Sequence, residues 1–118
     1  DIHRDAIERE DGTRIAPVAE IGGQKAAQIM IICGADNGRM NMPNYKQNLR
    51  FASALQNQLA SMYPDLARPV LFDYRNYNQQ LTTGSLLIEM GGHGNTLEEA
   101  KYSGRLVGNA LAQLFKGQ

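Results

Sequence analysis

The chain has 118 residues, enough for one domain with a modest hydrophobic core. Its 12 acidic and 12 basic residues balance, so no basic excess indicates a nucleic-acid partner. No apolar run is long enough to span a membrane, and a single cysteine excludes an internal disulfide. The chain starts without Met inside a motif, which predicts that its natural start lies upstream.

The first predicted elements are two extended runs, at residues 18–21 and 26–33. Gly22 and Gly23 separate them, and two adjacent glycines favour a hairpin because both tolerate a positive φ. The second run contains the lone cysteine, which we expect to be buried in a central strand. Residues 34–43 are rich in Gly, Asn and Asp, which predicts a loop at the carboxyl end of that strand.

From residue 44 the apolar period changes to three or four, which predicts an amphipathic helix ending before Pro64. The expected apolar stripe is Leu49, Ala52, Leu55, Leu59 and Met62. Residues 69–73 and 86–90 are then predicted as strands, with a polar loop at 74–83 between them.

A second helix is predicted after the glycines at 91, 92 and 94. Asn95 suits its N-cap, and Glu98 three residues later suggests a capping box. The expected apolar face is Leu97, Ala100, Val107, Ala110, Leu111 and Leu114. Strands alternating with helices predict an α/β fold, a layered sheet with flanking helices, although the elements are too few for a complete one.

Glu89 is the first candidate for chemistry. It follows an apolar run and precedes two glycines, so its carboxylate is expected in partly dry surroundings. Burial raises the pKa of a carboxyl group, and a general base near neutral pH needs such a shift. A purely structural role explains Glu89 equally well, either as an ion pair with a nearby arginine or as a bond to Asn95.

The two histidines are the other candidates. His3 lies between two aspartates, and imidazole is the commonest zinc ligand, often oriented by a neighbouring carboxylate. Alone, His3 reads as a surface histidine at a chain end. His93 is flanked by glycines, which favours a solvated loop position over a ligand.

Five stretches resemble, in order, the carboxyl-terminal part of the stage II sporulation protein P family, zinc-dependent cell-wall hydrolases of endospore-forming bacteria. They are DIHRDA at 1–6, QIMIICGADN at 28–37, PNYKQNLRFA at 43–52, YPDLARPV at 63–70 and YNQQLTTGSLLIEMGGHGNTLEEA at 77–100. That family is similar to the zinc N-acetylmuramoyl-L-alanine amidases. The resemblance implies an amidase-like α/β fold, of which residues 1–118 are one domain's carboxyl-terminal portion.

The resemblance also implies site residues. His3 matches a strand-end zinc ligand, and Glu89 matches the catalytic glutamate of a "VEIGF"-like strand end. Arg68 resembles the arginine of an "RGV"-like segment, and Asn78 lies in a loop expected to face substrate, so both are expected to bind substrate. His93 receives no role. The family's other zinc ligands belong to sequence that would precede Asp1.

The implied activity is hydrolysis of peptidoglycan by an amidase, with endopeptidase activity on cross-links, during engulfment. The implied setting is extracytoplasmic, with an upstream membrane anchor, a companion lytic transglycosylase and a membrane protein as partners. Two alternatives stay open: a non-catalytic module for wall binding or scaffolding, and an inactive fragment of the hydrolase.

Overall fold

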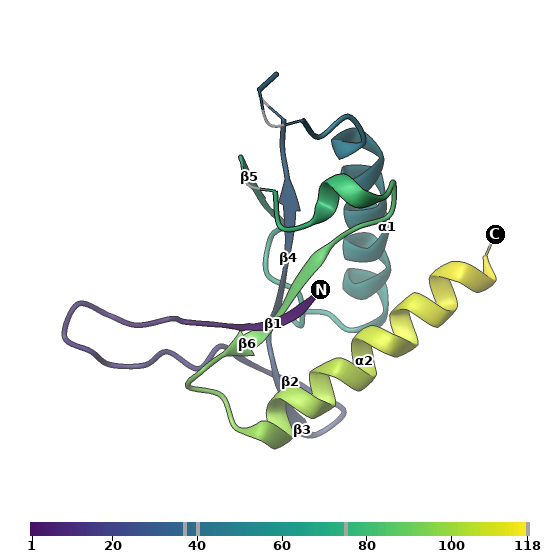
Figure 1. Ribbon diagram of the computed structural model, residues 1–118. Helices are drawn as coiled ribbons and strands as arrows, with labels where there is room; N and C mark the ends of the chain where they lie inside the picture. The colour runs from purple at the N-terminus through teal and green to yellow at the C-terminus, as the bar shows by residue number, and fades with distance from the viewer. Residues whose placement is uncertain (37, 40, 75, 118) are drawn as a thin grey trace.

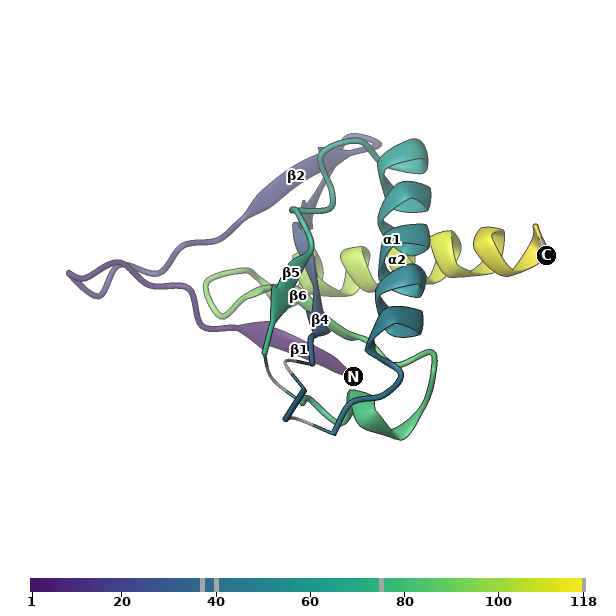
Figure 2. The same cartoon turned by 90° about the horizontal axis from the view of Figure 1, so that it is seen from above.

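The computed structural model describes residues 1–36, 38–39, 41–74 and 76–117, and is built around a four-stranded mixed sheet. The strand order is β1-β6-β4-β5, and the strands are β1 (Ile2–Asp5), β6 (Leu87–Gly92), β4 (Ile29–Gly34) and β5 (Leu71–Asp73). Helices α1 (Tyr45–Met62) and α2 (Leu97–Lys116) both lie on one side of this sheet, as Figures 1 and 2 show. The α/β class predicted from the sequence is confirmed.

Strand β6 is central: it runs parallel to β1 and antiparallel to β4. The register places Glu89 beside His3 of β1 and beside Met30 of β4. Because side chains alternate between the two faces of a sheet, these three side chains share one face. Ile29 and Met90 also pair, and they belong to the core that the helices cover. Glu89 therefore faces away from the helices.

Helix α1 forms where the sequence predicts it. Ala52, Leu55 and Leu59 are buried against the sheet, as the apolar spacing requires. The amide of Tyr63 bonds to the carbonyl of Leu59 and ends the helix just before Pro64.

The predicted hairpin is confirmed, but its second run divides into two strands. β2 (Val18–Ile21) and β3 (Gln24–Ala27) pair with each other through a turn at the two glycines, and Gln28 separates β3 from β4. Gln28 itself belongs to neither strand, and its side chain donates a hydrogen bond to the carbonyl of Asp65. Cys33 is buried in β4, as expected.

The predicted N-cap of α2 is wrong by one residue. Thr96 is the N-cap, and Glu99, not Glu98, completes the capping box with it. Asn95 is buried and closes the preceding loop: it accepts a hydrogen bond from the amide of Gly92 and donates to the carbonyl of Pro17.

Other predicted boundaries shift slightly. Leu97, expected in the core, is the first residue of α2 and is 63% exposed. The 69–73 strand is shorter and the 86–90 strand begins one residue later and extends through both glycines. Of the predicted loop at 34–43, Asn37 and Met40 lie outside the described residues.

The predicted loop at 74–83, of which Arg75 lies outside the described residues, is held by buried polar groups. It contains the short helix η1 (Gln79–Leu81). The Gln79 side chain accepts from the amide of Gly34 and donates to the carbonyl of Ile32, while Asn48 of α1 donates to the Gln79 carbonyl. These paired bonds satisfy groups that would be costly to bury alone.

The molecule is thin, with principal extents of 41 × 41 × 18 Å. The helices cover one face of the sheet, and within the described ranges no helix covers the face that carries Glu89 (Figure 2). Neither helix is long and apolar enough to cross a bilayer, a statement that holds for the described residues.

Gly91 lies two residues after Glu89, at a position where we expect a side chain to destabilise the fold. It has φ of +71°, and a Cβ there would lie 2.4 Å from Oδ1 of Asn95 and 2.6 Å from Cβ of Ala27. Gly23 has a similar φ of +81° but open space around it. We expect Gly23→Ala to lower the free energy of unfolding by about 1 kcal/mol through backbone strain alone. Gly91→Ala should cost about 2 kcal/mol more because of crowding.

Urea unfolding of both variants measures this difference. Equal losses would contradict the close packing at the end of β6.

Candidate active site

Four charged or ionisable side chains gather on the uncovered face of the sheet, and we call them the Glu89 cluster: His3, Asp5, Arg68 and Glu89. His3 is the β1 neighbour of Glu89, and Asp5 follows after an irregularity in the strand register. Arg68 donates its backbone amide to the carbonyl of Ile29, which places it beside β4. Asp5, His3 and Arg68 all act electrostatically on Glu89.

Glu89 is a buried carboxyl group with an unsatisfied oxygen. It is 7% exposed, and its Oε2 has no hydrogen-bond partner among the described residues. Burial raises the pKa of Glu89, the negative charge of Asp5 raises it further, and the charges of His3 and Arg68 oppose the shift. The raised pKa makes this carboxylate a stronger base than an ordinary glutamate.

Neither structural alternative for Glu89 is observed among the residues that the structure describes. Its Oε2 makes no hydrogen bond to Asn95, whose side chain is used within its own loop and at Glu99. No ion pair joins Glu89 to Arg68 in the described part of the chain, where Arg68 lies closest to Asp5.

Arg68 presents unused donors to the same space. Its Nη2 is 4.0 Å from Oδ2 of Asp5, too long for a hydrogen bond, and its buried Nε and Nη2 have no acceptor within the described chain. Its backbone is fixed on both sides, because its carbonyl accepts from Gln56 as well. Buried donors without acceptors are rare in native structures and indicate a place for an anionic group.

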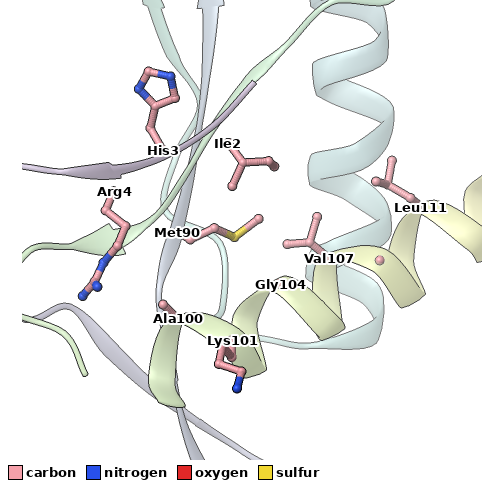
Figure 3. Close-up of a pocket in the computed structure, with 10 residues that line it drawn as sticks. Ile2, His3, Arg4, Met90, Ala100, Lys101, Gly104, Val107 and Leu111 are labelled. Carbon is pink, nitrogen blue, oxygen red and sulfur yellow. The ribbon is translucent and has the colours of Figure 1, made fainter. Parts of the chain in front are cut away.

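His3 lies at the edge of this cluster and is half exposed. Figure 3 shows its ring pointing away from α2, on the opposite side of β1 from Ile2. Its Nε2 is 3.5 Å from Oδ2 of Asp1, the arrangement of a carboxylate that orients an imidazole. A catalytic zinc site needs about three protein ligands. The described residues contain no group of three His, Cys, Asp or Glu side chains that could hold a metal, so they do not form a complete zinc site.

Asn78 lies elsewhere. It lines a polar cavity of about 380 Å³ with Asp1, Tyr77 and residues 84–86, at the amino-terminal end of β6. Its backbone adopts the left-handed region at φ of 61°. Asp1 connects this cavity to His3, but Asn78 is not part of the Glu89 cluster, and its contact with substrate stays a prediction.

The expectation that His93 is solvated is wrong. Its Nε2 lies 2.8 Å from Oε1 of Glu8, and its Nδ1 accepts from the amide of Ile7 at 3.2 Å. Both nitrogens are therefore engaged, and His93 ties the arm at residues 6–17 to the turn after β6. In Figures 1 and 2 this arm projects from the sheet.

Asp5 is the member of the cluster that the sequence reasoning missed. A signal was available, since Asp5 lies two residues after His3 in a predicted strand end and so shares its face. In the sequence, Asp5 was considered only as a carboxylate that could orient His3.

The family assignment follows from comparison with known proteins. The family model described as stage II sporulation protein P (SpoIIP) matches residues 1–112. The chain belongs to the stage II sporulation protein P family. Stage II sporulation protein P of Bacillus subtilis (strain 168) is 30% identical over 120 residues, which cover 98% of this chain and 27% of that relative. No solved structure matches the chain.

Membership implies a role in sporulation, and the resemblance predicted from five sequence stretches is confirmed. The α/β class is observed directly, whereas the amidase-like form of the fold stays a prediction.

The second prediction concerns the pKa of Glu89. Asp5 raises that pKa by charge repulsion, so Asp5→Asn should lower it. Carbon-detected NMR titration of the Glu89 carboxyl measures the shift directly. Glu8→Gln is the matched control, because Glu8 pairs with His93 and is not among the groups that shift Glu89. An unchanged pKa in Asp5→Asn would contradict the cluster.

The third prediction concerns stability. The folded pKa of Glu89 lies above the ordinary value of 4.5, so the folded state binds more protons than the unfolded state. Its contribution to stability is therefore present below pH 4.5 and is lost as pH rises through the folded pKa. Glu89→Gln cannot ionise and should gain stability relative to wild type as the pH rises above 4.5. Parallel curves of unfolding free energy against pH would refute this.

Proposed function

We propose that this chain forms part of a peptidoglycan hydrolase of sporulation, a zinc-dependent N-acetylmuramoyl-L-alanine amidase with endopeptidase activity on cross-links. The observation that supports it best is Glu89: a buried carboxyl with a raised pKa and an unsatisfied oxygen, paired in register with His3. Family membership supplies the sporulation setting. Because the matched stretch is 27% of the Bacillus subtilis relative, the whole protein's activity is part of the proposal.

Glu89 acts in this proposal as the general base and then as the acid. In its ionised form it accepts a proton from the attacking water, and it returns that proton to the nitrogen of the leaving amine. Its raised pKa makes it a stronger base for accepting that proton than an ordinary glutamate, and Asp5 supports that pKa. The required water would occupy the side of Oε2 that has no protein partner.

Arg68 serves as the anion-binding group. Its unused guanidinium donors can hold the developing oxyanion or a carboxylate of the stem peptide. Asn78 is assigned to substrate binding in the adjoining polar cavity, where its amide could bond to the sugar or peptide.

Zinc is the proposed cofactor, and it would polarise the scissile carbonyl and lower the pKa of a bound water to roughly 7. His3 is its ligand from this chain. The described residues do not complete the ligand set, so we propose that the remaining ligands come from residues outside these 118.

The proposed setting is extracytoplasmic, facing the cell wall, with a membrane anchor in upstream sequence. The proposed partners are the peptidoglycan itself, a lytic transglycosylase that opens the glycan strands, and a membrane protein. The balanced charge of the chain offers no footprint for nucleic acid.

A second candidate is a non-catalytic module for wall binding or scaffolding, or a hydrolase fragment without activity of its own. The incomplete metal-ligand set among the described residues favours this alternative for the chain taken alone. Zinc content distinguishes the two candidates.

The first experiment uses the chain and a version extended upstream with native sequence. Elemental analysis should find zinc in the extended version, and His3→Ala should remove it. Absence of zinc from every folded version would favour the wall-binding alternative.

The fourth prediction concerns catalysis by the zinc-loaded extended version. Glu89→Gln should lower hydrolysis of purified peptidoglycan at least about a hundredfold, with folding and zinc content unchanged, because the variant cannot accept the proton. Glu98→Gln is the matched control, since Glu98 is exposed in the first turn of α2. Comparable activity in the Glu89 variant would refute the assignment.

A further inference from the structure

A second candidate binding surface lies on the opposite side of the sheet from the Glu89 cluster. It is a groove of about 740 Å³ between α1 and the edge strand β5, and we call it the α1/β5 groove. Phe72 of β5 pairs in register with Cys33, which belongs to the core beneath the helices. The groove is therefore separate from the cluster. Its lining is Tyr45, Lys46, Leu49, Arg50, Ser53, Ala54, Asn57 and Phe72.

Two aromatic rings form one end of the α1/β5 groove. The ring centroids of Tyr45 and Phe72 are 6.4 Å apart with an interplanar angle of 33°. Phe72 is 47% exposed, an apolar ring facing solvent on a strand edge. An exposed ring packed on a half-buried one, beside polar groups, suits a ligand that is apolar on one face and polar at its rim, as a sugar ring is.

Two cations line the helix side of the groove. Lys46 and Arg50 lie one turn apart on α1, so they share a face, and Ser53 and Asn57 continue that row. Among the described residues, no acidic side chain lines the groove. Across the described residues, neither cation forms an ion pair. The groove thus carries an unbalanced positive charge, although the whole chain is neutral.

We propose that the α1/β5 groove is a non-catalytic binding site for the peptidoglycan strand. A sugar ring stacks on Phe72 and Tyr45, and carboxylates of the stem peptide pair with Lys46 and Arg50. Charge complementarity and the aromatic platform together select an anionic glycan over a neutral one. The choice of polymer rests on the proposed function, whereas the groove's charge and rings do not depend on it.

The role of such a site is to hold the protein on its insoluble substrate while the Glu89 cluster works on the other face. Binding at a second site raises the effective concentration of substrate at the first.

The test measures binding of the chain to peptidoglycan sacculi from which attached anionic polymers have been removed. Lys46→Glu/Arg50→Glu should weaken binding at least about tenfold, and raising the salt concentration should weaken wild-type binding because the contacts are exposed. Lys101→Glu/Arg105→Glu is the matched control: these exposed cations also lie one turn apart, on α2. This control variant makes the same change in net charge as the groove variant, and it should bind sacculi as tightly as wild type does.

Aromatic variants test the stacking contribution. Phe72→Ala should weaken binding at least about fivefold. Phe115→Ala should not, although Phe115 is 57% exposed and stacks on Phe51. Urea unfolding of every variant establishes that each is folded at the assay temperature. In addition, NMR of wild type with a soluble disaccharide-peptide should move amide signals of residues 45–57 and 72.

Three results would overturn the proposal: wild-type binding by both groove variants, equal weakening by the α2 control, or NMR shifts confined to other residues. Tighter binding of an acidic polyglutamate peptide than of the disaccharide-peptide would also overturn it, in favour of a protein partner. Failure of the hydrolase assignment is distinguishable, because hydrolysis is measured on the zinc-loaded extended version with Glu89→Gln, whereas groove binding is measured on the chain with Lys46→Glu/Arg50→Glu and Phe72→Ala.

Discussion

The pairing of β1 with β6 is the interaction on which the candidate active site depends. Four residues at the start of the chain align with a strand that begins more than eighty residues later. The amides of Ile88 and His93 bond to the carbonyls of Asp1 and Asp5 at 2.8 Å, one at each end of the pairing. Arg4 adds side-chain donations to the carbonyls of Gly92 and Asn95. Without this pairing His3 and Asp5 would not adjoin Glu89.

The pairing also decides the electrostatics of Glu89. A parallel neighbour in register brings like-facing side chains close, so Asp5 and His3 act on the same carboxyl with opposite sign. The sheet face that holds them has no helix above it in the described chain, yet Glu89 is nearly buried. Burial without a hydrogen-bond partner is unfavourable for a charged group, and sites for chemistry commonly accept this cost.

In the function we propose, catalysis and binding of the polymer take place on opposite faces of the sheet. On one face, strand ends assemble groups suited to proton transfer and anion binding. On the other face, α1 and β5 leave Phe72, Lys46 and Arg50 exposed to solvent. Both surfaces are accessible because the helices lie on one face of the sheet and leave Phe72 of the edge strand β5 exposed on that face.

The sequence by itself determined most of the local structure. The apolar period over residues 44–62 and the proline after it specify α1, and Gly22 with Gly23 specify the hairpin turn, because these signals act between residues near in the chain. The family likewise followed from linear motifs. The helix N-cap was missed by one residue because Thr96 and Asn95 are both good caps, and only the loop contacts of Asn95 with Gly92 and Pro17 separate them.

Only the tertiary structure decided which distant groups meet. Asp5 and Arg68 join Glu89 through strand pairing across long sequence separations, which no local pattern encodes. The bonding of His93 to Glu8 has the same cause, since the arm and the turn after β6 are brought together by β1. Periodicity gives the face on which a side chain lies, whereas strand order and register determine its neighbours.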